Sequence, residues 1–325
     1  MFANENTYVN FMDHKVLPCL NRRVHKGILT ADDGLDLYYE YYLAKHPKGA
    51  MVICHGFTEC SQKYKEMIYY FLRGGYHVFI MDCRGHGYSG RVVENLHKVY
   101  ASSFQDYIND LHKFVNTVIM PKTAGLPRFL YAHSMGGAIG AAYVEQYPTD
   151  FKKAVLNAPM IRMKTAGIPE WSAFAIAAVM HFTGHGRDFV PGQKQSIEGE
   201  CYETSASHSR ARFEYYLKRR LGDPMLQTCG STFDWLYHNI IGTHQLTSRR
   251  RCRAIATPLM IFMSDNDTCV KNTGIIDFVR KIRGKNCACP VRLYLVKNTR
   301  HEIYSNDSVE QLRAYYRKIF QFLED

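Results

Sequence analysis

The sequence predicts an α/β fold, in which a mostly parallel central sheet is flanked by helices. Short apolar runs of strand length alternate with segments whose apolar residues recur at helical spacing. Consecutive apolar residues within a run are typical of parallel strands that are covered on both faces. A length of 325 residues and a hydrophobic content of 46% allow a sizeable core in one large domain or two small ones. The predicted strands of this kind cover residues 50–54, 77–81, 129–131, 153–157, 257–263 and 291–296.

An interruption of this alternation divides the chain into parts. A β-hairpin over residues 26–43 opens the core, and the strand–helix pattern stops near residue 160 and returns after residue 250. The intervening segment has helical pieces rich in aromatic residues and methionine, which we interpret as a lid over the carboxyl ends of the strands. The predicted parts are an N-terminal leader segment (1–25), the first part of the core (26–159), a helical lid insertion (160–250) and the second part of the core (251–325).

Residues 129–137 have the strand–turn–helix pattern of a nucleophile elbow. A β-prone run ends at Ala132, Ser134 stands at the tip, and two glycines open a helix of small residues. Such a turn exposes the serine hydroxyl and directs the backbone N–H of Met135 towards a developing oxyanion. Because Ala132 replaces the first glycine of the usual G-x-S-x-G pattern, this stretch alone fits equally well a plain strand-to-helix turn with a capping serine.

Two further predicted strand ends supply the groups that a serine nucleophile needs. Asp265 and Asp267 follow the fifth strand, and His301 follows the last one. The chain order serine, acid, histidine is that of α/β-hydrolases, so we expect Ser134, Asp267 and His301 to meet at one edge of the sheet. The histidine would take the serine proton, and the acid would orient the imidazole. Asp267 is favoured over Asp265 because the residues after it fit the D-x-x-V pattern of this loop.

Further candidate site residues lie in the loop after the first of these strands and in the predicted lid. The backbone N–H of Phe57 is the expected second donor to the oxyanion. His55 is expected to make structural hydrogen bonds, with contact to the substrate as an alternative role. In the most apolar part of the lid, Trp171, Phe174 and Met180 are candidates to line an acyl-chain channel, with lid-to-core packing as their alternative role.

Composition limits the partners and cofactors. The net charge is +11, and residues 249–300 contribute twelve Lys or Arg and three Asp, a balance of +9. This basic segment is either a solvated surface or a surface that binds anionic lipid head groups. The ten cysteines lack paired metal-ligand spacing, and no motif resembles a nucleic-acid-binding module, so we expect no cysteine metal site and no nucleic-acid partner.

The sequence also predicts where the protein is found. No apolar run approaches the roughly 20 residues of a membrane-spanning helix. The first six residues lack the basic and apolar regions of a signal peptide. We therefore expect a cytoplasmic protein with reduced thiols, or one with peripheral contact at the inner face of the membrane.

Several motifs together indicate a family, namely residues 55–57, 82–91, 132–137, 158–160 and 300–302, with residues 207–210 and 223–224 in the lid. In these motifs, from about residue 25 onward, the chain resembles the bacterial lysophospholipases and monoacylglycerol lipases, and most of all the inner-membrane lysophospholipase type. That type also carries Ala-His-Ser-Met-Gly-Gly, so Ala132 agrees with it. The resemblance implies an α/β-hydrolase fold and hydrolysis of a single acyl ester on a glycerol backbone, without cofactor or metal. It leaves the head group open, because both kinds of enzyme share these motifs.

Two other functions are compatible with the sequence. A peptidase of the same fold would use acidic lid residues to hold the ammonium group of its substrate, and Glu198, Glu200 and Glu203 are available. A non-catalytic protein that binds an acyl ligand would be expected to lack a member of the triad, whereas all three residues are present. We therefore predict a serine hydrolase that cleaves the acyl ester of lysophospholipids or monoacylglycerols through an acyl-enzyme intermediate.

Overall fold

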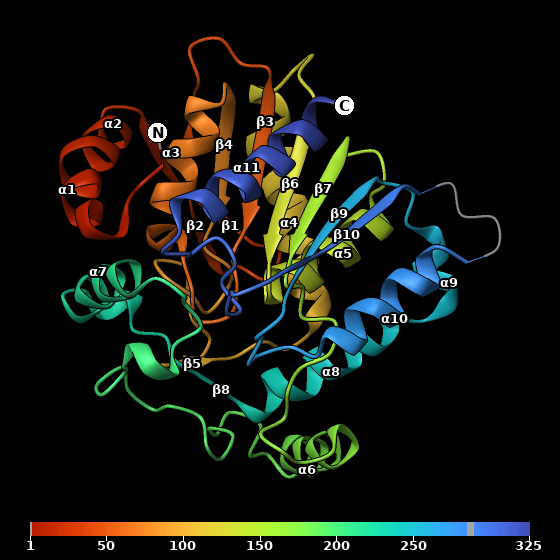
Figure 1. The fold of residues 1–325 in the computed structure, drawn as a ribbon. Coiled ribbons are helices and arrows are strands. Elements are labelled where there is room, and N and C mark those ends of the chain that lie inside the picture. Colours follow the sequence, from red (N-terminus) through yellow and green to blue (C-terminus); the bar gives the residue numbers. More distant parts are fainter. Residues whose placement is uncertain (1, 285–288) are drawn as a thin grey trace.

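The computed structural model describes residues 2–284 and 289–325, and an eight-stranded sheet lies at the centre of this part of the chain (Figure 1). The strand order is β1-β2-β4-β3-β6-β7-β9-β10. The hairpin of β1 and β2 is antiparallel, β2 pairs antiparallel with β4, and all other neighbours are parallel. The bounds are β1 (Val24–Thr30), β2 (Asp36–Tyr42), β3 (Gly49–Cys54), β4 (Tyr76–Met81), β6 (Arg128–His133), β7 (Lys153–Asn157), β9 (Leu259–Ser264) and β10 (Val291–Val296).

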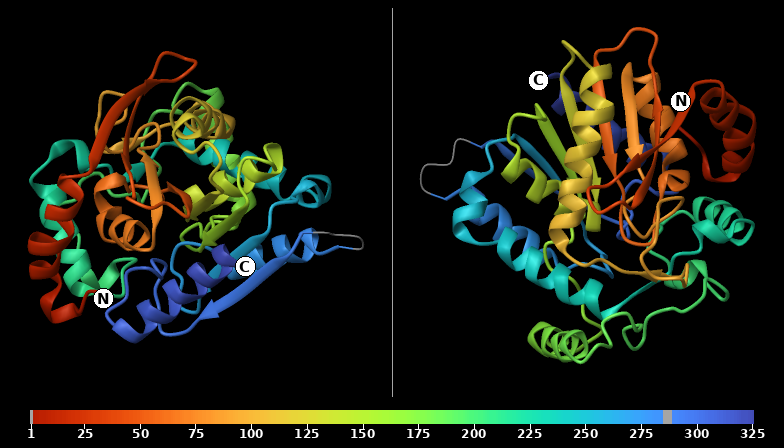
Figure 2. Two further views of the ribbon diagram at one scale, coloured as in Figure 1. Left: turned by 90° about the horizontal axis from the view of Figure 1, so that it is seen from above. Right: turned by 180° about the vertical axis from the view of Figure 1, so that it is seen from behind.

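Helices cover both faces of the sheet. α11 lies in front of the sheet in Figure 1, and α4 lies in front of it in the view from behind (Figure 2). The core on one face includes α3 (Lys65–Arg73), α11 (Val309–Glu324) and the N-terminal α1 (Tyr8–Phe11) and α2 (Leu17–Asn21). The core on the other face includes α4 (Phe104–Phe114), α5 (Met135–Gln146), α9 (Arg249–Ala254) and α10 (Asn272–Ile282).

The burial of these elements follows their apolar patterns. Every residue of β3, β4, β7 and β9 is buried, as expected for strands with helices on both faces. α11 buries only the residues that recur at helical spacing, including Leu312, Tyr316 and Ile319, and exposes the opposite side to solvent. The alternation of apolar strands with amphipathic helices is therefore the pattern that determines the layered core.

The helices α6 (Glu170–Phe182), α7 (Arg210–Leu221) and α8 (Phe233–Leu246), which lie within the predicted lid segment 160–250, are placed below the sheet in Figure 1, beyond the carboxyl ends of the parallel strands. A short strand, β8 (Gly230–Ser231), pairs with β5 (Lys98–Val99) and connects this segment to the core. α6 packs along α8, where the rings of Phe174 and Tyr237 stack with centroids 5.5 Å apart. Within the described residues, no helix is both long enough and apolar enough to cross a bilayer.

Candidate active site

Ser134 stands at the tip of the sharp turn between β6 and α5. Its φ of 53° and ψ of −116° fall in a region that residues other than glycine rarely adopt. Its N–H donates to the carbonyl of Asn157 at 3.0 Å, and its own carbonyl accepts from the N–H groups of Ala138 at 3.1 Å and Met160 at 2.8 Å. These bonds from β7, the loop after it and α5 hold the strained backbone in place.

Small residues around Ser134 allow α5 to approach the sheet closely. A Cβ atom on Gly136 would lie 2.4 Å from the carbonyl oxygen of Cys54, which is closer than side chains tolerate. A Cβ atom on Gly140 would lie 2.9 Å from the Cβ of Ala132. Gly140 of α5 has no side chain, and this leaves the space that the methyl group of Ala132 occupies. This explains how alanine fits where the usual elbow pattern has glycine.

His301 and Asp267 approach Ser134 from the loops after β10 and β9. His301 Nε2 lies 2.8 Å from Ser134 Oγ, and His301 Nδ1 lies 2.7 Å from Asp267 Oδ2. All three side chains are buried. The structure thus brings these three predicted residues together with the hydrogen-bond connectivity of a Ser-His-Asp triad.

The surroundings of Asp267 keep its carboxylate charged. Oδ1 accepts hydrogen bonds from the N–H groups of Cys269 and Val270, both at 2.8 Å. Burial raises the pKa of Asp267, but the hydrogen bond and charge of His301 and these two N–H groups outweigh it, so this pKa lies below its usual value. An ionised Asp267 places the proton of His301 on Nδ1 and leaves Nε2 free to accept the proton of Ser134.

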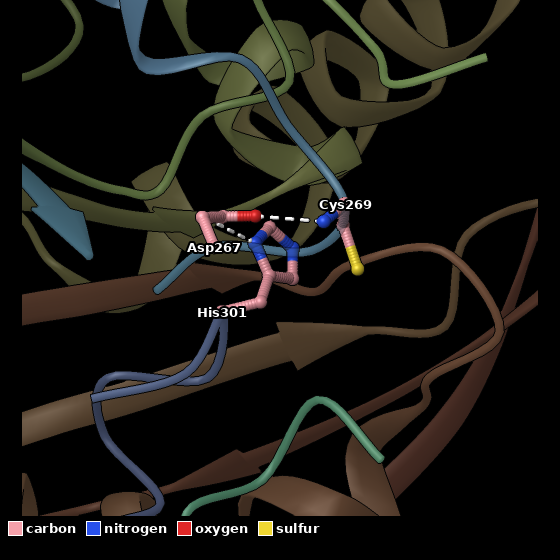
Figure 3. Close-up of side chains that lie close together, drawn as sticks. All are labelled: Asp267, Cys269 and His301. Carbon is pink, nitrogen blue, oxygen red and sulfur yellow. Dashed lines mark hydrogen bonds and ion pairs between the residues drawn. The ribbon is translucent and has the colours of Figure 1, made fainter. Parts of the chain in front are cut away.

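Cys269 adds a third potential metal ligand beside this pair (Figure 3). One donor atom each from Asp267, Cys269 and His301 lies within 4.8 Å of the others. Both oxygens of Asp267 and both ring nitrogens of His301 already take part in hydrogen bonds. A metal ion would have to replace the bonds that orient the triad, so the donor set fits a hydrogen-bonded triad better than a metal centre.

The two expected oxyanion donors come from different segments: Met135 directly follows Ser134, and Phe57 lines a cavity beside Ser134 from another loop. Met135 is the first residue of α5, and Phe57 follows Gly56 in the loop after β3. The N–H of Gly56 donates to Glu59 Oε2 at 2.7 Å, which fixes the start of this loop. The backbone N–H groups of Phe57 and Met135 are therefore still our predicted oxyanion donors.

A buried ion-pair network beside the site was not predicted from the sequence. Lys63 Nζ lies 2.8 Å from Glu59 Oε1 and 2.5 Å from Glu302 Oε1. The hydroxyls of Tyr64 and Tyr304 also donate to Glu59, at 2.6 and 2.8 Å. The network joins the loop after β3 to the loop after β10. The only local signal for it is the spacing of four residues between Glu59 and Lys63, because Glu302 comes from a distant part of the chain.

The two acids of this network have opposite pKa shifts. Burial raises the pKa of Glu59, but the charges of Lys63 and His133 and its hydrogen bonds outweigh it, so this pKa is well below its usual value. Burial raises the pKa of Glu302, and together with the charge of Glu59 it outweighs the charge and the hydrogen bond of Lys63, which lower this pKa. The Lys63 ammonium pairs with both carboxyl groups, so it is not a free cation at the site.

A cavity of about 460 Å³ opens beside Ser134 and His301, beneath the inserted segment. Phe57 forms part of its wall, and its ring packs on Trp235 with centroids 4.4 Å apart. A largely apolar cavity of this size can hold an acyl chain. The apolar lining residues include Met160, Met163, Ile168, Ala173, Ile176, Phe233, Trp235, Leu236 and Val270.

Three residues that the sequence suggested for substrate binding do not line this cavity. Trp171 is 74% exposed on the outer side of α6, and Phe174 stacks on Tyr237 of α8. Met180 is half-buried on the same helix and also lies outside the lining. α6 contributes Ala173 and Ile176 instead. The helix is apolar on most of its circumference, so its sequence does not indicate which side faces the cavity.

His55 is likewise outside the cavity lining. Its Nδ1 lies 2.8 Å from the carbonyl oxygen of Gly56, and its Nε2 accepts the N–H of Cys83 at 2.8 Å. The ring therefore ties the loop after β3 to the loop after β4. This is the structural role expected from the sequence, and the alternative role of substrate contact has no support in the lining of the cavity.

The chain matches a known protein family over most of its length. The family described as serine aminopeptidase, S33 (Hydrolase_4) matches residues 45–308 of the chain. The chain belongs to the Hydrolase_4 family. It is therefore an α/β-hydrolase and an enzyme, which confirms the fold class and the enzyme class predicted from its motifs.

Several named proteins align with most of the chain. Lysophospholipase L2 of Escherichia coli K12 is 28% identical over 252 residues, which cover 77% of this chain and 73% of the relative. Monoacylglycerol lipase of Mycolicibacterium smegmatis is 24% identical over 259 residues, covering 80% of this chain and 83% of the relative. The crystal structure of a soluble variant of monoglyceride lipase from Saccharomyces cerevisiae matches with a TM-score of 0.72 at 19% identity, covering 92% and 94% of the two chains.

Proposed function

We propose that this chain is a serine carboxylic-ester hydrolase that cleaves the single acyl ester of lysophospholipids or monoacylglycerols. The observation that carries the proposal is the hydrogen-bonded series Ser134, His301 and Asp267, with distances of 2.8 and 2.7 Å, at the wall of a largely apolar cavity. Relatives named as lysophospholipase and monoacylglycerol lipase support the same substrate classes.

In the proposed reaction, Ser134 Oγ attacks the ester carbonyl while its proton passes to His301 Nε2. The backbone N–H groups of Met135 and Phe57 stabilise the oxyanion of the tetrahedral intermediate. His301 then gives the proton to the leaving glycerol oxygen, and the acyl group stays on Ser134. Water, deprotonated by His301, releases the fatty acid and restores the free serine. Asp267 stabilises the imidazolium in both halves of the reaction.

The peptidase alternative has less support from the positions of the acidic residues. Glu198, Glu200 and Glu203 do not line the cavity beside Ser134. Glu200 pairs with Arg220 at 2.7 Å, and Glu203 pairs with Arg210 at 2.7 Å on the exposed surface. Glu59 and Glu302 do reach this cavity, but both pair with Lys63. A substrate ammonium would therefore have to compete with an internal cation.

We also propose a peripheral membrane contact, with α6 as its centre. Trp171, Val179 and Phe182 of this helix are 74%, 60% and 76% exposed, an unusual set of large apolar side chains to leave in water. The basic segment gives a second candidate surface, because Arg249, Arg250 and Arg253 are exposed in α9. Residues 285–288 of that segment lie outside the described residues.

The proposed function is tested by fatty-acid release from a lysophospholipid and from a monoacylglycerol. The wild type should hydrolyse at least one of them, and Ser134→Ala should lower turnover by about 10⁴-fold or more while remaining folded. Ser231→Ala is the matched control, since Ser231 lines the same cavity without belonging to the triad. Wild-type turnover by Ser134→Ala, or no release from either lipid by the wild type, would contradict the proposal.

A further inference from the structure

A second cavity, of about 400 Å³, adjoins the cavity beside Ser134. α7 forms much of its wall, together with the helical turn after the β3 loop and the segment around Gln193. Charged and hydroxyl-bearing side chains dominate this lining, in contrast to the apolar wall under α6. The two cavities meet along a shared set of residues, which are Thr58, Lys63, Gln193, Ala206, Cys269 and Glu302.

One cation in the second cavity has no acidic partner. Among the described residues, Arg219 is the lining cation without an acidic group within 4.0 Å. Its Nη2 donates to Gln62 Oε1 at 3.2 Å, and its Nε is buried without a hydrogen-bond partner. The other lining cations pair with acids: Lys63 with Glu59 and Glu302, Lys65 with Glu40, Lys194 and Arg220 with Glu200, and Arg212 with Glu66.

We propose that this second cavity receives the phosphate-bearing head group of a single-chain phospholipid, and that Arg219 binds the phosphate. The inference rests on the proposed ester hydrolysis and names its substrate class. A guanidinium presents neighbouring N–H groups in a planar fork that matches two phosphate oxygens. Arg219 lines the cavity, and the hydrogen bond of its Nη2 to the neutral Gln62 leaves its charge uncompensated, so a phosphate that contacts the Nη groups would neutralise it.

The arrangement of the two cavities fits such a substrate. With the ester carbonyl at Ser134 Oγ, the acyl chain lies in the apolar cavity and the head group extends past the shared wall. Lys63 stands in that wall, but Glu59 and Glu302 neutralise it. Lys194 and Arg220 share the single carboxylate of Glu200, whereas Arg219 has no acidic partner, so Arg219 is the lining cation that gains most from the phosphate of a head group. A monoacylglycerol carries no phosphate, so its binding leaves the charge of Arg219 uncompensated.

The test compares a short-chain lysophosphatidylcholine with a monoacylglycerol of the same acyl chain, both below their critical micelle concentrations. Monomeric substrates remove differences in binding to a charged lipid surface. The quantity measured is kcat/KM for each lipid, in the wild type, Arg219→Gln, Arg219→Lys and Lys218→Gln. Lys218 is the matched control, because it is exposed on the same helix, carries the same charge and does not line the cavity.

Arg219→Gln should lower kcat/KM for the lysophospholipid by about 10-fold or more, mainly through a higher KM, because it removes a charge-assisted contact made before the chemical step. Its kcat/KM for the monoacylglycerol should stay at the wild-type value. Arg219→Lys should recover part of the loss, and Lys218→Gln should change neither substrate. The free head group, glycerophosphocholine, should inhibit the wild type competitively and Arg219→Gln only weakly.

Several results would overturn the inference. An equal loss for both lipids would give Arg219 a structural role instead. An unchanged ratio, or equal inhibition of wild type and Arg219→Gln by glycerophosphocholine, would place the phosphate elsewhere. Inhibition by inorganic phosphate through Arg219 with an unchanged ratio would make this an anion site unrelated to substrate. If the wild type hydrolyses neither lipid, the proposed function fails and this inference fails with it.

Discussion

Asp265 and Asp267 stand two residues apart in the loop after β9 and serve different parts of the site. Asp267 faces His301 Nδ1 at 2.7 Å and is buried. Asp265 is exposed and accepts the N–H groups of Asn298 at 2.9 Å and Thr299 at 3.3 Å. Asp265 therefore supports the loop that carries the histidine, whereas Asp267 contacts the imidazole itself.

The first prediction separates these two acids. Asp267→Asn should lower kcat on a soluble ester by about 10³- to 10⁴-fold, because the amide no longer stabilises the imidazolium or holds its tautomer. Asp265→Asn should keep most of the activity, since its amide oxygen can still accept a backbone N–H. Steady-state kinetics of the two variants provide the measurement. Equal losses in both variants would remove Asp267 from its proposed role.

At the scale of the element, the elbow from β6 to α5 depends on close contact between helix and sheet. Gly136 approaches the carbonyl oxygens of Cys54 and His55, where a Cβ atom would lie at 2.4 and 2.5 Å. These are rigid backbone atoms of β3 and its loop, so they cannot move aside cheaply. The same loop carries Phe57, so its position relative to Ser134 depends on this contact.

The second prediction follows from that contact. Gly136→Ala should lower the free energy of unfolding by about 1–3 kcal/mol through overpacking and should also reduce kcat by displacing the loop of Phe57. Ala132→Gly should leave activity close to wild type, because Gly140 already provides the space at that position. Urea unfolding and ester hydrolysis measure both effects. Wild-type stability and activity in Gly136→Ala would show that the elbow accommodates a side chain for which the structure leaves no room.

The third prediction concerns α6. Replacing Trp171 and Phe182 with serine should weaken binding to lipid vesicles and slow hydrolysis of micellar lipid, because both exposed rings lose their apolar contact with the bilayer. Hydrolysis of a soluble monomeric ester should stay unchanged, since neither ring lines the cavity. Vesicle sedimentation at low and high salt gives the binding. Loss of binding with salt alone, in wild type and variant equally, would favour the basic segment as the contact surface.

At the scale of the whole molecule, buried neutral histidines make stability depend on pH. Burial is the main cause that lowers the pKa of His133 to about 3, and it likewise lowers the pKa of His86 to about 3. In the unfolded chain both rings titrate near 6.5. The unfolded state therefore binds more protons below that pH, and the stabilising effect is complete above about pH 6.5.

The fourth prediction is a loss of stability in acid. Between about pH 6 and pH 3.5 the free energy of unfolding should fall by roughly 1.4 kcal/mol per pH unit for each of these two histidines. His86→Asn should reduce the dependence of this free energy on pH by the contribution of one histidine. Denaturant unfolding at a series of pH values measures it. A free energy of unfolding that is constant over this range would show that the rings are already protonated or exposed in the folded state.

Much of this architecture could be predicted from the sequence because its signals are local. Continuous apolar runs indicate the strands of the sheet, and the order of Ser134, Asp267 and His301 at strand ends predicts that they meet. Parallel strands bring their carboxyl ends to one edge of the sheet, so residues that directly follow different strands lie close together in space. The close match between predicted and observed strands, such as β6 and β9, reflects this physical rule.

Other features depend on contacts between distant residues and left no local pattern. Lys63 meets Glu302 across 239 positions of sequence, and β5 pairs with β8 through two residues in each strand. The side of α6 that faces the cavity is set by its packing on α8. This is why the sequence offers Trp171 as a candidate for the substrate channel or for lid packing, although its side chain is 74% exposed. The second cavity likewise forms only when α7 lies against the turn after β3.

The most direct test of the central claim is to observe the acyl-enzyme on Ser134. Wild-type protein is mixed with a p-nitrophenyl ester of a fatty acid, quenched in acid within the first turnover, digested and analysed by mass spectrometry. We predict an added acyl mass on the peptide that contains Ser134, and none on that peptide in Ser134→Ala. An acyl group on another residue, or turnover with no covalent intermediate in the first cycle, would contradict the account.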